Sequence, residues 1–303
     1  MDVGLYELMR VFARVADAGS FTAVAGETGQ SQPTISRQIA ALEAHLGKRL
    51  LTRSTRSLAL TEDGRVFLDH ARLALDAIED AAGSLSERGG SVSGVVRISA
   101  SVAFGRLNLV PRLGALLSRH PKLEVDLVLD DRFVDIVEEG VDLAIRIGEM
   151  ADSGLAARKI GEVERLTVAS PAYWKRMGRP AHPRDLKDHD CLLYTSAQGR
   201  DVWSFETPEG PVKVKVAGRI RVSVSDAMRE AVLAGLGVGL TPRSFWTNEL
   251  KTGRVEQVFA DYPPRRSPVY AVFPTRRLIA ARVRAVADFL SEAFAGDSAL
   301  RIS

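Results

Sequence analysis

A pair of short helices joined through one glycine constrains the fold of this chain more than any other feature. Ser20 can cap a helix over residues 21–28, and Gly29 follows it as a turn residue. Ser31 can cap the next helix. Pro33 is tolerated in its first turn, where the missing N–H would have no partner within the helix. With the apolar stripe of a preceding helix, these segments form a helix-turn-helix pattern. Other small helical domains share this spacing, so the pattern alone leaves the function open.

The third helix of this pattern combines a buried face with an unusual outer face. Its apolar residues recur at helical steps: Ile35, Ile39, Leu42 and Leu46. The opposite face carries small and hydrogen-bonding side chains with a single charge in the first two turns: Gln32, Thr34, Arg37, Gln38 and Ala41. A face that only kept the helix soluble would more often be crowded with Lys and Glu. This face indicates close approach to another surface.

A short basic hairpin, or wing, is predicted directly after this helix. Apolar stretches at 50–51 and 58–60 bracket a turn rich in Arg, Ser and Thr, with Arg53 and Arg56 near its tip. Residues 31–60 contain five bases and one acid, a local charge of +4 against +3 for the whole chain. This excess suits a polyanion, although a solvated basic turn would have the same composition.

A long helix over about 62–86 is predicted next, with Thr61 as its cap and acids in its first turn. Its apolar residues alternate steps of four and three, as in a coiled-coil seam: Phe67, Ala71, Ala74, Ile78, Ala81 and Leu85. A helix with such a seam needs a partner along it. A second copy of the chain is the economical choice, and packing against its own chain is the alternative.

Beyond a stretch with the composition of a flexible linker (ERGGSVSG, 87–94), strands and helices alternate. Strands are predicted at 95–99, 123–129, 141–147, 166–170, 212–216, 219–224, 238–241 and 268–273, and helices at 107–118, 133–139, 226–234 and 278–295. This alternation predicts parallel sheets with helices on both faces and a ligand site at the carboxyl ends of the strands.

Several classes of chemistry lack the motifs they require. Cys191 is the only cysteine, so neither an internal disulfide nor a cysteine-based zinc site can form. His182 and His189 have no third ligand nearby, and the chain contains no Gly-x-Ser-x-Gly elbow, Walker loop or paired-carboxylate motif. The closely spaced glycines of 234–240 follow a helix and precede a strand, the reverse of a dinucleotide site, and predict a helix C-cap. We therefore expect no catalytic site, no metal and no cofactor.

The hydropathy pattern predicts no membrane segment. No apolar run approaches the 18 residues that a membrane helix requires, and residues 1–14 lack the basic-then-apolar order of a signal peptide. We therefore expect a cytoplasmic protein without a membrane partner.

Short motifs at fixed offsets make residues 19–64 resemble the winged helix-turn-helix of the LysR-type transcriptional regulators. The matching pieces are Gly19-Ser20-Phe21-Thr22, Ser31-Gln32-Pro33, Ser36-Arg37-Gln38-Ile39, Leu42-Glu43, Leu46-Gly47 and Leu60-Thr61-Glu62-Asp63-Gly64. Thr28 and Gln30 depart from the family, which usually has apolar residues there that pack the turn. Gly26, inside the second helix, costs roughly 1 kcal/mol relative to Ala. The rest of the chain resembles the same family.

The resemblance implies an α/β fold with an N-terminal α part. Residues 1–61 would form the winged helix-turn-helix DNA-binding domain, with the helix-turn-helix at 21–40. Residues 62–86 would form the dimerisation helix, 87–93 a hinge, and 94–303 an effector-binding domain. Its two α/β lobes would be like those of periplasmic binding proteins. Lobe one would comprise 94–162 and 267–303, and lobe two 163–266.

The resemblance also implies that the third helix lies in the major groove of double-stranded DNA. The candidate contacts on that helix are Gln32, Thr34, Ser36 and Arg37, and Arg37 best suits bidentate reading of guanine. Arg53 and Arg56 on the wing would meet phosphates or the minor groove. The resemblance also implies a homodimer or tetramer, with RNA polymerase as a further candidate partner.

A small-molecule effector would bind between the two lobes, where strand ends and helix N-termini favour anions. The candidate effector-binding residues lie at strand ends and helix starts: Ser99, Ser101, Asp130, Arg146, Gly148, Thr195, Ser196 and Ser225. Arg146 offers a fork suited to carboxylate, so we expect a small organic acid. Each of these residues also fits a plain cap, turn or ion pair.

Two other functions fit parts of the chain. A solute-binding protein for transport or sensing is the alternative that the last 210 residues allow, and an enzyme comes third. The N-terminal 61 residues and the missing signal-peptide pattern favour the regulator.

Overall fold

The structure, a computed structural model, describes residues 3–53, 58–84, 92–132, 136, 139–150, 155–195, 201–274 and 279–302. The chain divides into two compact units, Met1–Ser91 and Val92–Ser303. The predicted helix at 133–139 lies almost wholly outside the described residues.

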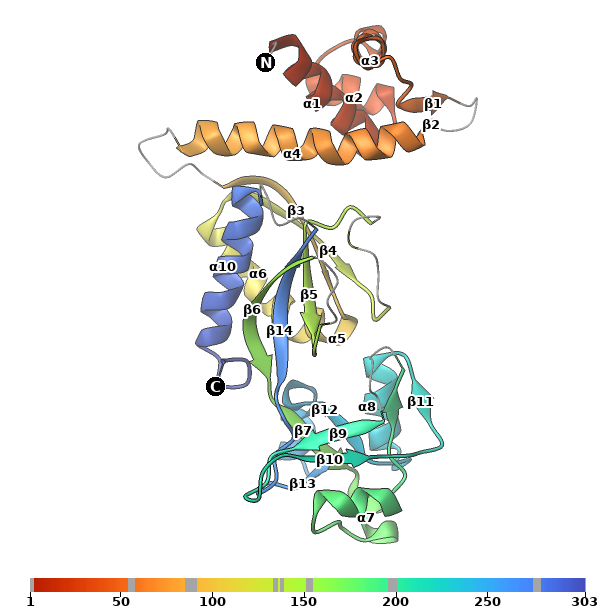
Figure 1. Cartoon of the computed structure of the whole chain (residues 1–303), viewed down its shortest axis with the longest axis vertical. Coiled ribbons are helices and arrows are strands. Elements are labelled where there is room, and N and C mark those ends of the chain that lie inside the picture. Colours follow the sequence, from red (N-terminus) through yellow and green to blue (C-terminus); the bar gives the residue numbers. More distant parts are fainter. Residues whose placement is uncertain are drawn as a thin grey trace. The chain divides into compact units, whose positions relative to one another are not determined.

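The first unit is a helical bundle with a two-stranded wing (Figure 1). Its elements are α1 (Val3–Ala18), α2 (Phe21–Thr28), α3 (Gln32–Leu46), β1 (Leu51–Arg53), β2 (Leu58–Leu60) and α4 (Glu62–Ser84). The predicted caps are confirmed: Ser20 Oγ accepts from Ala23 N, and Ser31 Oγ accepts from Thr34 N. Gly29 ends α2 at φ 67°, a left-handed conformation that glycine adopts without strain.

One hydrophobic core joins the four helices of this unit, α2 through Val24 and Ala25. Phe12 of α1, Ile35 and Leu42 of α3, and Leu68 and Ala71 of α4 are all buried in it. Burying these apolar surfaces stabilises the bundle at about 25 cal/mol per Å² removed from water. The predicted buried face of α3 is therefore confirmed, and its opposite face is left for other contacts.

A side chain of α3 fixes the start of the wing. Glu43 Oε1 accepts hydrogen bonds from Leu50 N at 2.8 Å and from Leu51 N at 3.1 Å. Thr61 Oγ1 donates to the Arg49 carbonyl at 2.7 Å and accepts from Gly64 N at 2.8 Å. Thr61 therefore caps α4, as predicted, and also ties that helix to the wing.

The second unit consists of two lobes. Lobe one is built on a five-stranded sheet in the order β4-β3-β5-β14-β6 (Figure 1). Its strands are β3 (Ser93–Ala100), β4 (Lys122–Leu129), β5 (Leu143–Ile147), β6 (Ala156–Val163) and β14 (Ser267–Phe273). Its helical segments are α5 (Val102–Phe104), the π-helical turn η1 (Gly105–Leu109), α6 (Val110–Arg119) and α10 (Ala281–Ala295).

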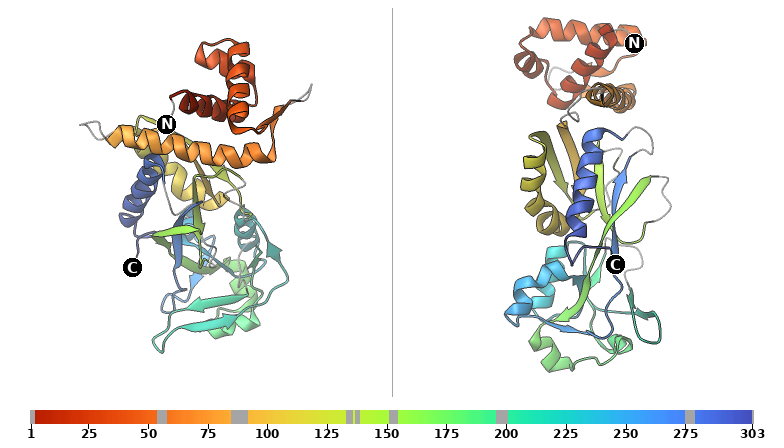
Figure 2. Two further views of the ribbon diagram at one scale, coloured as in Figure 1. Left: turned by 45° about the horizontal axis from the view of Figure 1, so that its top comes forward. Right: turned by 90° about the vertical axis from the view of Figure 1, so that its left-hand side faces the viewer.

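Among the described residues, α6 and α10 lie side by side on one face of this sheet (Figure 2). Leu116 of α6 and Leu290 of α10 pack with Ile98 of β3 in the lobe's main core. On the other face, Ile136 and Val141 pack with Ala144 of β5 and Val272 of β14.

Lobe two has short strands that form several small sheets. Its elements are β7 (Arg165–Ala169), α7 (Pro171–Met177), η2 (Pro183–Asp188), β8 (Leu193–Tyr194), β9 (Val202–Phe205), β10 (Val212–Lys215), β11 (Arg221–Val222), α8 (Ser225–Leu233), β12 (Gly239–Pro242), η3 (Arg243–Trp246), α9 (Thr247–Lys251) and β13 (Glu256–Val258). A three-stranded sheet has the order β12-β7-β13, and β9 with β10 and β8 with β11 form separate pairs.

The expectation of parallel sheets is confirmed for only part of the fold. β3 runs parallel to β4 and β5, but β14 is antiparallel to both β5 and β6. The chain leaves lobe one along β6 and returns along β14, so these neighbours run in opposite directions. In lobe two, β7 is antiparallel to β12 and to β13. Alternation of strands and helices along a sequence does not encode these directions.

The glycine-rich stretch after α8 forms the predicted helix C-cap. Gly235 has φ 70°, its N–H donates to the Val232 carbonyl, and the Leu236 N–H donates to Ala231. These two bonds form a Schellman motif. The chain then enters β12, so the prediction of a cap rather than a nucleotide loop is confirmed.

Candidate DNA-binding and effector sites

The outer face of α3 presents the first group of candidate residues. Gln32 and Arg37 are exposed, whereas Thr34 and Ser36 are half-buried. The Thr34 hydroxyl lies 2.8 Å from that of Ser31, so it takes part in the cap of α3. Gln32 and Arg37 therefore reach furthest toward any surface that approaches the helix.

Two exposed arginines lie on or near this face, whereas the acid of this segment is directed toward the wing backbone. Glu43, the one acid of residues 31–60, is half-buried and accepts backbone hydrogen bonds from the wing. Lys48 pairs with Asp63 at 3.3 Å, and Arg37 and Arg49 are exposed. The side chain of Arg53 and the whole of Arg56 lie outside the described residues.

In lobe one, Ser99 and Arg146 come together across neighbouring strands. Arg146 Nη1 donates to Ser99 Oγ at 3.3 Å, and Ser99 is fully buried. Burial lowers the pKa of Arg146, because the guanidinium has lost part of its hydration. A less hydrated cation attracts an anion more strongly than one in water.

The other lobe-one candidates have different local roles. The Arg132 guanidinium and backbone N–H donate to the Asp130 carboxylate and lower the pKa of Asp130. Gly148 has φ 106°, and its N–H donates to Pro268. Ser101 precedes α5 and makes no side-chain cap bond, so its half-buried hydroxyl is not used to cap the helix.

In lobe two, two hydroxyl groups lie near each other. Ser225 Oγ is 3.4 Å from Tyr194 Oη, and Thr195 Oγ1 donates to the Val222 carbonyl at 3.2 Å. Tyr194 was missed by sequence reasoning because its strand, β8, is only two residues long. Ser196 lies outside the described residues.

Asp131 joins the two lobes and was also missed as a site residue. Its Oδ1 accepts from Val102 N in lobe one at 3.0 Å, and its Oδ2 accepts from Ser225 N in lobe two at 3.1 Å. In the sequence, the two adjacent acids after the predicted strand are only weak evidence for acid–base chemistry, and they do not indicate a contact with lobe two.

Comparison with known proteins accounts for both units. Residues 6–65 match the family model for the bacterial regulatory helix-turn-helix protein of the lysR family, and residues 89–295 match the LysR substrate binding domain. The chain belongs to the LysR family.

Its relatives in this family match over nearly their whole length. The chain is 36% identical to the transcriptional regulator DmlR of Escherichia coli over 293 residues, covering 95% of this chain and 94% of DmlR. The solved structure of CrgA, a LysR-type regulator from Neisseria meningitidis, has 27% identity, covers 96% of this chain and 99% of CrgA, and has a TM-score of 0.59. The full-length Vibrio cholerae virulence activator AphB has 29% identity, covers 94% and 97%, and has a TM-score of 0.55.

The candidate dimerisation residues of this LysR-type regulator lie partly within its own core. The Phe67 ring lies 5.7 Å from that of Phe12, Ala71 is buried, and Ala74 packs on the same core. Ile78 is half-buried, whereas Leu85 lies outside the described residues. In the first half of the seam, these residues therefore pack against their own chain rather than being left for a second copy.

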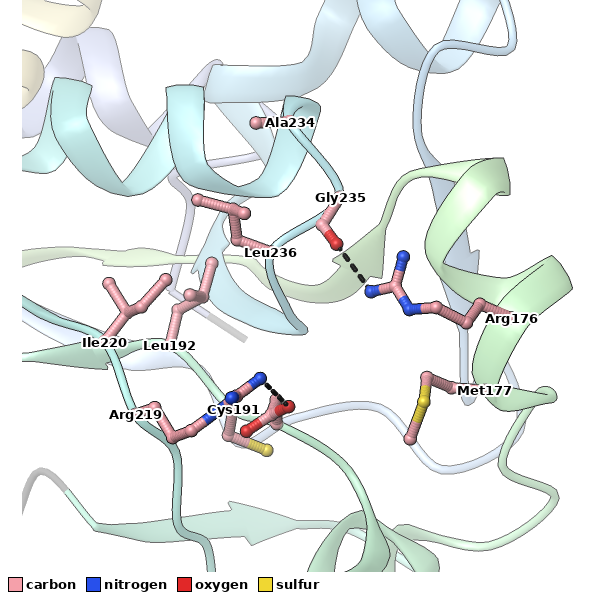
Figure 3. A pocket seen from close by; sticks show the side chains of 10 residues that line it. Arg176, Met177, Cys191, Leu192, Arg219, Ile220, Ala234, Gly235 and Leu236 are labelled. Atoms are coloured by element: carbon pink, nitrogen blue, oxygen red, sulfur yellow. Dashed lines mark hydrogen bonds and ion pairs between the residues drawn. The ribbon is translucent and has the colours of Figure 1, made fainter.

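Lobe two of the LysR effector domain contains a cavity of about 480 Å³ that includes none of the predicted site residues. Arg176, at the end of α7, reaches toward Gly235 and donates to its carbonyl at 2.9 Å (Figure 3). Arg219 pairs with Asp190 at 3.3 Å. The charged groups of this cavity are therefore already paired with protein atoms.

The single cysteine of this LysR-type chain lies in a hydrophobic core of lobe two. Cys191 is buried, and this burial raises the pKa of its thiol to about 12. Within the described ranges, no three His, Cys, Asp or Glu side chains are placed to hold a metal. No helix in those ranges is long and apolar enough to cross a membrane.

Proposed function

We propose that this LysR-type regulator is controlled by a small organic acid that binds between the two lobes of its second unit. The observation that carries the proposal is the Arg146–Ser99 contact, a half-buried guanidinium beside a buried hydroxyl. A planar guanidinium binds a carboxylate through two parallel hydrogen bonds. Ser101 of lobe one, and Tyr194 and Ser225 of lobe two, would add hydroxyl groups around the acid.

For operator recognition, we infer that Gln32 and Arg37 read base edges while Thr34 and Ser36 contact base or phosphate. Support comes from the exposure of the first two side chains at the start of α3. Arg53 and Arg56 would meet the phosphate backbone, where contacts add affinity more than sequence information. The working place of the protein would be the cytoplasm, with RNA polymerase as a further partner.

For assembly, we infer a homodimer or tetramer formed in part along α4. Phe67 and Ala71 are used in the core of their own unit, so the partner would meet a different side of the helix. Val66 supports this inference, because it is 53% exposed on α4. Ile78, which is half-buried, lies about 20° around the helix from Phe67 rather than on the side of Val66, so it would be a separate contact with the partner beyond the core.

The effector proposal is tested with the full-length protein in a thermal-shift screen of small organic acids, amines and neutral metabolites. An acid that raises the unfolding temperature of the wild type should lose this effect in Arg146→Ala and weaken in Ser101→Ala. Lys159→Ala is a matched control, because Lys159 lies in lobe one but pairs with Glu162. Stabilisation only by amines or neutral compounds, or stabilisation that survives both cleft substitutions, would contradict the proposal.

A further inference from the structure

The Asp131 side chain accepts hydrogen bonds from both lobes of the second unit. Asp131 follows β4, and its two carboxylate oxygens accept from different lobes: Oδ1 from Val102 N and Oδ2 from Ser225 N. Val102 begins the helical run that continues through α6, and Ser225 begins α8. Backbone N–H groups in the first turn of a helix have no partner within the helix. The Asp131 carboxylate therefore satisfies one such donor on each side.

The other ionic contact near this point is weaker. Arg106 Nη2 lies 3.0 Å from Asp226 Oδ1, and both side chains are about half exposed. Exposed ion pairs contribute little, because water and salt screen them. Asp131, in contrast, is half-buried. Hydrogen bonds to a charged acceptor are also stronger than those between neutral groups.

The neighbouring Asp130 does not contact the second lobe in the way that Asp131 does. Asp130 is also an aspartate at the end of β4, but its carboxylate accepts from Arg132 of its own loop. Two adjacent carboxylates thus have different roles: Asp130 stabilises the loop, whereas Asp131 reaches the second lobe.

We propose that Asp131 is an internal latch, whose carboxylate holds the lobes together in the place that the carboxylate of a bound acid would otherwise take. Two backbone donors from opposite lobes that converge on one carboxylate are the arrangement expected around an anion bound between lobes. An entering acid would have to displace Asp131 or bind beside it at Arg146. The competition between Asp131 and an entering acid rests on the function proposed above. The contact of Asp131 with both lobes does not depend on any effector.

The latch is tested by hydrogen–deuterium exchange of the full-length protein, with fragmentation that resolves single amides. In Asp131→Ala, the amides of Val102 and Ser225 should both exchange at least about tenfold faster, since each loses a hydrogen bond to a charged acceptor. Asp130→Ala is the matched control and should leave the Ser225 amide unchanged. Should Asp131→Ala fold poorly, Asp131→Asn retains one acceptor oxygen and should lose protection at one of the two amides.

Chemical rescue tests whether the Asp131 carboxylate occupies an anion position. Sodium acetate added to Asp131→Ala should restore protection at Val102 and Ser225 together, while sodium chloride at equal ionic strength should not. In the wild type, acetate should change neither amide. Unchanged exchange at Ser225 in Asp131→Ala, an equal loss in Asp130→Ala, or failure of acetate to restore protection would each overturn the proposal. These measurements require neither DNA nor an identified effector. They can therefore support or overturn the latch even if the screen of organic acids finds no ligand.

Discussion

The carbonyl oxygen of Leu50 lies so close to Gly64 that a Cβ built on Gly64 would stand 2.0 Å from it. Real Cβ atoms do not approach other heavy atoms within 3.0 Å. The same carbonyl accepts from Thr61 N at 2.9 Å, so it cannot turn away without losing that bond. The first turn of α4 therefore packs against the backbone before β1 at a distance that only glycine permits.

Gly64→Ala should consequently destabilise the N-terminal unit by about 1–3 kcal/mol, as overpacking in a core does. The obstacle is backbone rather than a flexible side chain, so the helix or the wing has to shift. Urea unfolding followed by circular dichroism would measure the change. A midpoint equal to that of the wild type would show that α4 can move away at no cost.

Gly26→Ala should have the opposite effect. Gly26 is exposed inside α2, and a Cβ there would meet no heavy atom within 4 Å. Alanine has a higher helix propensity than glycine, and it lowers the conformational entropy of the unfolded chain. We therefore expect stabilisation of roughly 0.5–1 kcal/mol. The same unfolding assay applies, and a loss of stability would reveal a contact of α2 that the unit does not show.

Arg37→Ala should reduce discrimination between operator and unrelated DNA. One bidentate contact to guanine contributes roughly 1–3 kcal/mol of discrimination, whereas a phosphate contact contributes equally to all sequences. Fluorescence anisotropy with an operator fragment and a scrambled fragment would measure both affinities. Arg56→Ala is the comparison, expected to weaken both fragments alike and to flatten the salt dependence. An unchanged ratio in Arg37→Ala would contradict the recognition face.

Val66→Asp should dissociate the oligomer while the N-terminal unit stays folded. The residue is exposed in the single chain, so a charge there is costly only where a partner covers it. Ala71→Asp, in contrast, places a charge in the core and should unfold the unit. Sedimentation velocity with circular dichroism separates these outcomes. If Val66→Asp sediments like the parent, α4 does not associate through that side.

Cys191 should react slowly with thiol reagents until the protein unfolds. With its pKa raised by burial from 9.0 to about 12, its thiolate fraction at pH 8 is about a thousandfold below that of an unperturbed thiol. The unfolded thiol ionises first as the pH rises, so the contribution of Cys191 to stability is present below about pH 9 and is lost between pH 9 and about 12. If a thiol reagent labels the native protein at pH 8 as fast as it labels the protein in urea, this prediction is wrong.

Local chemistry made several helix ends and turns in both units predictable from the sequence. The caps at Ser20 and Ser31, the turn at Gly29 and the Schellman motif at Gly235 involve groups no more than five residues apart. Such interactions are the same in any tertiary context, so the sequence alone determined where these helices begin or end. The buried stripe of α3 was equally visible, because helical periodicity places Ile35, Ile39 and Leu42 on one side.

Long-range packing decided the remaining features of the fold and the candidate sites. The inward turn of Glu43, the antiparallel placing of β14 and the packing of Phe67 on Phe12 all depend on which segments meet. The strand ends predicted that Ser99 and Arg146 would lie at one edge, but only the strand order β3-β5 brought them into contact. Asp131 and Ser225 are 94 residues apart, and no local pattern couples them. Their contact exists because folding brings the loop after β4 to the start of α8, which is a property of the tertiary structure alone.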